Sequence, residues 1–196
     1  LSAIKPGIFP VFILAPTIAT LFLAFIRMGI VIRQARNLGE EKVLARTDEL
    51  TGLPNRRRLI AELDAFSQVE GALLLLDLNH FKPVNDQYGH EVGNEVLRHV
   101  ARRFSRVLPT GSIIARLGGD EFGVLAYGSP DDTLELAYAL AATLSYPLSI
   151  NGHALKLGVS IGYVKNDGGK NLLERADAAM YEAKKSGVEV FQASPL

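Results

Sequence analysis

Three acidic residues in two short stretches are the strongest candidates for chemistry in this sequence. Asp120 and Glu121 follow Gly118-Gly119, between apolar runs at residues 113–117 and 122–127. Apolar runs joined by a glycine pair are typical of a β-hairpin, because glycine adopts the positive φ that tight turns need. The two carboxylates would lie at the tip of the hairpin, where a cation can reach them. Acidic residues are also common in loops that have no function, so the hairpin alone leaves both interpretations open.

The third acidic residue, Asp77, ends a continuous apolar run over residues 72–76. Such a run is typical of a strand buried on both faces, and the carboxyl ends of strands are where α/β sheets bind ligands. If this strand lies beside the hairpin, three carboxylates meet, and like charges repel unless a cation lies between them. A set of oxygen ligands favours Mg²⁺ or Mn²⁺ over zinc. A lone aspartate after a strand is more often a turn residue, so the metal site depends on both stretches.

Residues 118–122 read GGDEF, the signature of the GGDEF family, the diguanylate cyclases, which join two GTP molecules into cyclic di-GMP. Three more stretches resemble motifs of this family: DELTGLPNR at 48–56, FKPVNDQYGH at 81–90 and ADAAMYEAK at 176–184. The resemblance extends from about residue 45 to residue 191. It implies an α/β (α+β layered) fold like the palm of nucleotidyl cyclases, with a central, mostly antiparallel sheet flanked by helices.

The resemblance implies a role for each acidic residue. Asp77 and Asp120 would hold metal ions, Mg²⁺ or Mn²⁺, aided by the carbonyl of Leu78. Glu121 would be a further metal ligand or would help to deprotonate the attacking ribose hydroxyl. Phosphoryl transfer of this kind is catalysed mainly by positioning and by the neutralisation of charge.

The resemblance also implies a binding site for GTP. Lys82 would contact the terminal phosphates as a point charge, together with the amides around His80–Phe81. Lys184 would add a phosphate contact, although a lysine on a charged helix face is as often simply solvated. Asn85 would bind the guanine edge, and its alternative interpretation is a turn residue. Asn94 stands where the family usually has an aspartate that accepts hydrogen bonds from guanine, and an amide offers only one oxygen.

Two functions remain open at this stage. The first is a diguanylate cyclase that works as a homodimer, with one GTP in each subunit. The second is a catalytically weak, GTP-binding regulatory module that controls an adjacent domain, such as a C-terminal cyclic di-GMP phosphodiesterase. Asn94 motivates the second function, as does Val188, which replaces the arginine usual after Gly187. The chain begins with Leu1 rather than methionine, so we expect a piece of a longer protein.

Composition and the N-terminal stretch indicate where the protein works. The 196 residues include no cysteine, which excludes disulfides and thiolate metal sites, and the formal net charge of zero gives no sign of nucleic-acid binding. Residues 8–32 are almost entirely apolar, long enough for a transmembrane helix within residues 1–32. A signal peptide or a buried helix would fit this run less well. The basic residues that follow the run predict a bacterial inner-membrane protein whose domain faces the cytoplasm.

The remaining sequence predicts a helical linker at 33–47 and one domain at 48–192. Amphipathic patterns predict helices at 56–66, 94–108, 131–145 and 171–186, and strands at 148–150, 154–163 and 188–191. Residues 80–89 are expected to form a loop, with Asn94 capping the helix that follows. Asn171 and Glu174 resemble a capping box, and Gly187 would end that helix.

Overall fold

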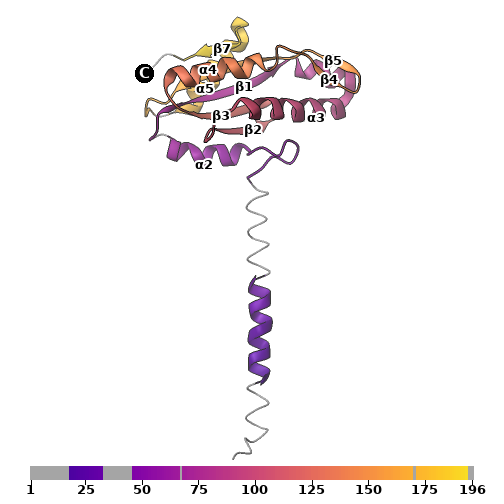
Figure 1. The fold of residues 1–196 in the computed structure, drawn as a ribbon, viewed down its shortest axis with the longest axis vertical. Coiled ribbons are helices and arrows are strands. Elements are labelled where there is room, and N and C mark those ends of the chain that lie inside the picture. Colours follow the sequence, from indigo (N-terminus) through magenta and orange to yellow (C-terminus); the bar gives the residue numbers. More distant parts are fainter. Residues whose placement is uncertain (1–17, 33–45, 67, 170, 194–196) are drawn as a thin grey trace, which may run out of the picture. The chain divides into compact units, whose positions relative to one another are not determined.

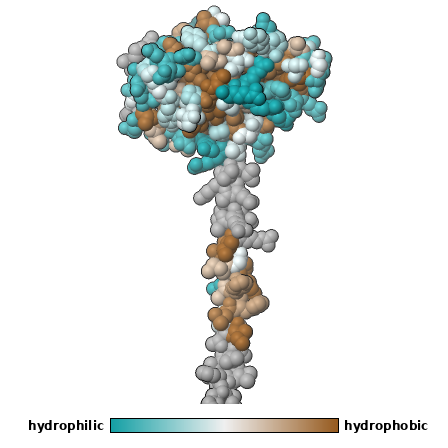
Figure 2. Space-filling view, in the orientation of Figure 1, coloured by the Kyte–Doolittle hydropathy of each residue, from teal (hydrophilic) through white to brown (hydrophobic). Residues whose placement is uncertain are grey.

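The structure, a computed structural model, describes residues 18–32, 46–66, 68–169 and 171–193. Contacts divide the chain into two compact units, Leu1–Val43 and Leu44–Leu196. In the first unit, residues 18–32 form a helix whose surface is largely hydrophobic (Figure 2). Its large apolar side chains are exposed, and Phe25 is the most exposed of them. Within the described ranges, no helix combines the length and the apolar character needed to cross a bilayer. Residues 8–17 of the expected span and 33–45 of the expected linker lie outside the described residues.

The second unit is built on a five-stranded sheet in the order β2-β3-β1-β6-β7 (Figure 1). Its strands are β1 (Gly71–Asn79), β2 (Ile113–Gly118), β3 (Glu121–Tyr127), β6 (Gly158–Lys165) and β7 (Val190–Gln192). The helices are α2 (Arg56–Phe66), α3 (Phe81–Val107), α4 (Pro130–Ala142) and α5 (Leu172–Ser186), and β4 (Leu148–Ile150) pairs with β5 (His153–Leu155). Among these five described strands, only β7 pairs in parallel, with β6. The expected mostly antiparallel sheet flanked by helices is therefore confirmed.

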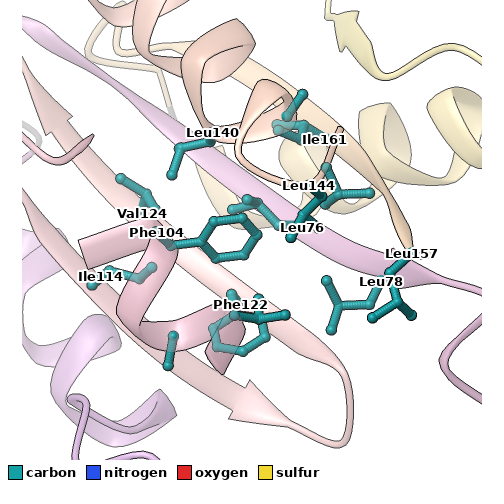
Figure 3. Packing of buried hydrophobic residues seen from close by; sticks show 14 of the residues in the cluster. Leu76, Leu78, Phe104, Ile114, Phe122, Val124, Leu140, Leu144, Leu157 and Ile161 are labelled. Atoms are coloured by element: carbon teal, nitrogen blue, oxygen red, sulfur yellow. The ribbon is translucent and has the colours of Figure 1, made fainter. Parts of the chain in front are cut away.

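The central strand, β1, is apolar without a break from Ala72 to Leu76, because helices cover both faces of the sheet. Leu74 and Leu76 pack in a cluster with residues of α3 and α4, and Figure 3 shows Leu76 near Phe104 and Phe122. Leu73 and Leu75 pack on the opposite side, in a cluster with residues of α2 and α5. Successive side chains of a strand point to opposite faces, so a strand between two helical layers needs an unbroken apolar run. Such burial fixes the register that delivers Asp77 to the end of the strand.

The largest difference from the predicted elements is in α3. The expected loop at 80–89 is helical from Phe81 onward, and the helix is broken only at Gly89, where φ is 82° and ψ is 163°. Asn94 lies inside this helix, so its expected capping role is wrong. The sequence did not predict the helical segment between Phe81 and Gly89, because proline and glycine, here Pro83 and Gly89, are typical of loops. Proline is nevertheless tolerated in the first turn of a helix.

Two smaller expectations are also corrected. The expected strand at 154–163 is two strands, since β5 turns back on β4 and β6 enters the main sheet. Asn171 precedes α5 in the left-handed conformation, with φ of 65°, and its side chain makes no capping hydrogen bond. Gly187 does end α5 in the left-handed conformation, as expected. The predicted final strand is present as β7, shifted to Val190–Gln192.

Candidate active site

Three carboxylate residues meet at one end of the sheet because β1 lies between β3 and β6. Asp77 on β1 is paired with Glu121 on β3 in the antiparallel register. The Leu78 amide donates a hydrogen bond to the Asp120 carbonyl over 3.3 Å, which joins the hairpin tip to the end of β1. The hairpin turns at Gly118 and Gly119, both with positive φ. The structure thus brings together the two stretches that the sequence analysis selected.

Lys184, on α5, places a positive charge against Asp77. Its Nζ donates a hydrogen bond to Asp77 Oδ1 over 2.7 Å, and the Asp77 side chain is only 11% exposed. This hydrogen bond, together with the negative charges of Asp77, Asp120 and Glu121, raises the pKa of Lys184. The lysine therefore stays protonated and offsets one of the negative charges.

The other two carboxyl groups have raised pKa values, chiefly because they are partly buried. Burial raises the pKa of Asp120, and the nearby charge of Asp77 raises it further. Burial likewise raises the pKa of Glu121, with added repulsion from Asp77, Asp120 and Asp177. Within the described parts of the chain, no group of three or more acidic, histidine or cysteine side chains is arranged to hold a metal ion. The donor atoms are nevertheless carboxylate oxygens with excess negative charge, the chemistry that suits a divalent cation.

We expect the substitution Glu121→Gln to stabilise the fold at neutral pH in buffer without divalent cations. A carboxyl group whose pKa is raised by folding contributes stability below its ordinary pKa and loses it as the pH rises through the raised value. The uncharged amide removes this loss, so the thermal midpoint of the variant should exceed that of the wild type by a few degrees. Melting curves at neutral pH and below about pH 4 test this, because the difference should vanish in acid. A wild type that is the more stable at neutral pH would contradict it.

A pocket opens beside the carboxylates, between the end of β1, the start of α3 and the end of α5. It is lined by Leu78, Asn79, His80, Phe81, Lys82, Pro83, Asp120, Ser160, Lys184 and Gly187. His80 takes the left-handed conformation, with φ of 66°, and so turns the chain from β1 into α3. The first amides of a helix lack partners within it and attract anions. Two lysines and a helix N-terminus thus make the pocket suitable for phosphate groups.

Besides the turn glycines, four of the predicted site residues lie outside the lining of this pocket. Asp77 is buried behind it, paired with Lys184. Glu121 lines a different pocket, together with Arg56 and Asp177. Asn85 and Asn94 lie farther along α3, on either side of the break at Gly89.

Arg116 is a site residue that sequence reasoning missed. Its Nη1 donates hydrogen bonds to both carboxylate oxygens of Asp48, over 3.1 and 3.0 Å, and its Nε and Nη2 donate to the Gly119 carbonyl over 3.1 and 2.8 Å. Although burial opposes it, hydrogen bonds from Thr51 and Arg116 lower the pKa of Asp48. Arg116 therefore ties the hairpin turn to the segment before α2. Their opposite charges were the only feature of the sequence that could suggest that Arg116 and Asp48 pair. Because the two residues are far apart in the sequence, their spacing does not predict the pair.

Comparisons with known proteins agree with this geometry. The sequence model of the family described as "Diguanylate cyclase, GGDEF domain" matches residues 45–189. The diguanylate cyclase DgcP of Pseudomonas aeruginosa is 38% identical over 165 residues, which are 77% of this chain and 24% of that protein. The bifunctional diguanylate cyclase/cyclic di-GMP phosphodiesterase MucR of the same organism is 41% identical over 155 residues, 74% of this chain and 23% of that protein. The chain thus spans about a quarter of each of these relatives.

A solved structure shows the same fold. It is the coiled coil and GGDEF domain of DgcB from Caulobacter crescentus in complex with c-di-GMP, with a TM-score of 0.79 and 29% sequence identity. The match covers 89% of this chain and 99% of that chain.

Proposed function

Because this chain belongs to the GGDEF family, we propose that it is a diguanylate cyclase, which condenses two GTP molecules into cyclic di-GMP and releases pyrophosphate. The observation that carries the proposal is the pocket at the end of β1. There Lys82, Lys184 and the N-terminus of α3 line one pocket, and Asp120 lines it as well. A pocket lined by two lysines and one carboxylate suits a metal-bound triphosphate.

The acidic residues would serve the chemical step. In this step a ribose 3′ hydroxyl attacks an α-phosphate, a P–O bond forms, and pyrophosphate leaves with the electron pair of the broken bond. A divalent cation, Mg²⁺ or Mn²⁺, would neutralise charge on the phosphates when bound, and Asp77, Asp120 and the Leu78 carbonyl would hold it. Glu121, whose pKa is raised chiefly by burial, would be a further ligand or would accept the proton of the attacking hydroxyl. A carboxylate with a raised pKa is the better base.

The remaining predicted residues would bind the nucleotide. Lys82, Lys184 and the amides at His80–Phe81 would hold the terminal phosphates. Asn85 and Asn94 would contact the guanine. Each subunit would hold one GTP, so two subunits must face each other for the reaction, and we propose a homodimer.

We also propose that residues 1–32 anchor the protein in the bacterial inner membrane, with the catalytic domain in the cytoplasm and residues 33–47 as a helical linker. Support comes from the exposed apolar side chains of the helix at 18–32 and from the basic residues that follow it. Extraction of the full chain from bacterial membranes by buffer without detergent would contradict this anchor.

A regulatory module is the second candidate function. Asn94 and Val188 favour it, because each removes a group that would strengthen GTP binding. MucR, which carries phosphodiesterase activity by name, illustrates the neighbour that such a module would control.

Incubation of the full chain with GTP and Mg²⁺, in detergent or in lipid vesicles, separates these functions. A cyclase should form cyclic di-GMP and pyrophosphate in a 1:2 ratio, measured by chromatography and a pyrophosphate assay. Binding of GTP without product would favour the regulatory module. Failure to bind GTP would overturn both functions.

The substitution Arg116→Ala should lower turnover about tenfold and destabilise the fold by about 1 to 3 kcal/mol, because a partly buried, charged hydrogen-bond network is broken. The loss of the Gly119 anchor would let the hairpin turn move relative to β1. Arg116→Lys should not rescue the activity, since a lysine cannot make the forked contacts of a guanidinium. Urea unfolding and the rate of cyclic di-GMP formation measure the two effects.

Arg175→Ala is the matched control for this prediction. Arg175 pairs with Asp167 over 2.9 Å, and its side chain is 14% exposed, against 12% for Arg116. The control removes a comparable ion pair away from the hairpin, so it should change stability but not turnover. Equal losses of turnover in both variants would contradict a specific role for Arg116.

A further inference from the structure

Gly93 is a glycine in the interior of a helix, where glycine weakens the helix relative to alanine. It is buried, and it is not among the glycines with positive φ, so its backbone does not require glycine. The surrounding atoms, however, leave space only for glycine at this position. A Cβ at this position would overlap Asn85 Oδ1, would lie 2.9 Å from Asn85 Cγ and would lie 3.4 Å from Phe81 Cζ. The Asn85 carboxamide therefore fills the volume that any other residue at position 93 would need.

This contact exists because α3 is broken. In a straight helix, residues eight apart are separated by about 12 Å along the axis, too far for a side chain of asparagine to reach the other backbone. The non-helical conformation of Gly89 turns the segment that begins at Phe81 back against the segment that contains Gly93. The break at Gly89 and the absence of a side chain at Gly93 together create the space that the Asn85 side chain occupies.

We infer that Gly93 is a positioning residue for guanine recognition, acting through Asn85. The inference rests on the proposed function, in which Asn85 contacts the guanine. An asparagine carboxamide has two different ends, a donor and an acceptor, so its orientation decides which base edge it fits. Contact with the Gly93 backbone restricts this orientation before the nucleotide arrives, which lowers the cost of ordering the side chain on binding.

Two consequences distinguish this role from a general requirement for packing. Substitution at Gly93 should weaken the binding of the base but not of the phosphates, because the phosphate pocket is lined by Lys82 and Lys184 and not by Asn85. The effect should also disappear when Asn85 has no side chain, because an alanine at position 85 leaves room for the new Cβ.

The experiment compares the full-length wild type, Gly93→Ala, Asn85→Ala and the double variant, with Gln87→Ala as the control. Gln87 is an exposed residue of the same helix segment. The affinity for GTP is measured by isothermal titration, and inorganic tripolyphosphate is titrated as a probe of the phosphate pocket. Thermal midpoints are recorded without nucleotide.

We expect Gly93→Ala to weaken GTP binding about tenfold and to leave tripolyphosphate binding within twofold of the wild type. The double variant should match Asn85→Ala in affinity and should melt at a higher temperature than Gly93→Ala. Rescue of the melting temperature by Asn85→Ala supports the contact even if Gly93→Ala is too unstable for titration.

Equal weakening of GTP and tripolyphosphate, or additive losses in the double variant, would overturn the positioning role while the wild type still binds GTP. A wild type that binds tripolyphosphate but not GTP would overturn the proposed function as well. The two failures are therefore distinguishable.

Discussion

Replacing Asp120 with alanine is expected to abolish measurable formation of cyclic di-GMP, with a fall in turnover of about a hundredfold or more. Loss of one group that stabilises developing charge in a preorganised site typically costs this much. Asp120 lies at the hairpin tip, its backbone carbonyl accepts a hydrogen bond from the Leu78 amide, and the residue lines the same pocket as Lys82 and Lys184. A cation bound there would lose one of its two proposed carboxylate ligands.

The exposed Asp131, in the first turn of α4, provides the matched control for Asp120. Asp131→Ala removes the same charge from a helix that takes no part in the site, so turnover should stay within twofold of the wild type. Turnover and GTP affinity are measured for both variants over a range of Mg²⁺ concentrations. An Asp120→Ala variant that retains more than half of the wild-type turnover would refute the assignment of Asp120.

Asp77 is paired with Lys184, so we expect its substitution to have a different effect on GTP binding from that of Asp120. Its carboxylate accepts a hydrogen bond from Lys184 over 2.7 Å. An Asp77→Asn substitution would remove both a metal ligand and the charge that holds this lysine. The freed ammonium group can then turn to phosphate, so GTP binding without metal should be retained while turnover is lost.

The sequence predicted those parts of the site that depend on local pattern. The unbroken apolar run of β1 is explained by burial on both faces of the sheet. The glycine pair of the hairpin is explained by a turn that needs positive φ. These explanations were enough to place Asp77 and Asp120 at strand ends. The pairing of β1 with β3 entered the sequence analysis only as a condition, because no local rule pairs strands so distant in sequence.

Other parts could not be read from local pattern. The first segment of α3 contains Pro83 and ends at Gly89, residues that usually signal loops, but its Phe81 and Val84 pack into the core, which stabilises the helix. The ion pair of Arg116 with Asp48 depends on tertiary structure alone. Lys184 was assigned to phosphate from its motif, whereas the fold pairs it with Asp77.

The position of Lys184 depends in turn on a glycine in β6. Gly162 lies in the middle of the strand, and a Cβ there would overlap the backbone of α5 at Met180 N and Ala176 O and would lie 2.8 Å from Met180 Cα. The face of α5 that meets the sheet carries small side chains, among them Ala176, Ala179 and Ala183. Helix and strand therefore approach with almost no side-chain volume between them, and Lys184 is one turn beyond Met180.

The substitution Gly162→Ala should destabilise the fold by about 3 kcal/mol, at the upper end of the cost of overpacking, because the obstacle is backbone and cannot change rotamer. The new methyl group must push α5 away from the sheet, which separates Lys184 from Asp77. Turnover should fall about tenfold in the fraction of protein that remains folded. Urea unfolding measures the first effect, and the rate of cyclic di-GMP formation in protein that remains folded measures the second.

Gly158→Ala tests whether close approach, rather than glycine itself, is responsible. Gly158 begins the same strand, but a Cβ there would make only an ordinary contact of 3.5 Å with the Asn79 side chain. The control should therefore change stability by no more than about 0.5 kcal/mol. If both variants were equally stable, α5 would have room to spare over β6, and the position of Lys184 could not be attributed to Gly162. If Gly162→Ala loses both stability and turnover and Gly158→Ala loses neither, the absence of a side chain at Gly162 is what allows α5 to place Lys184 beside Asp77.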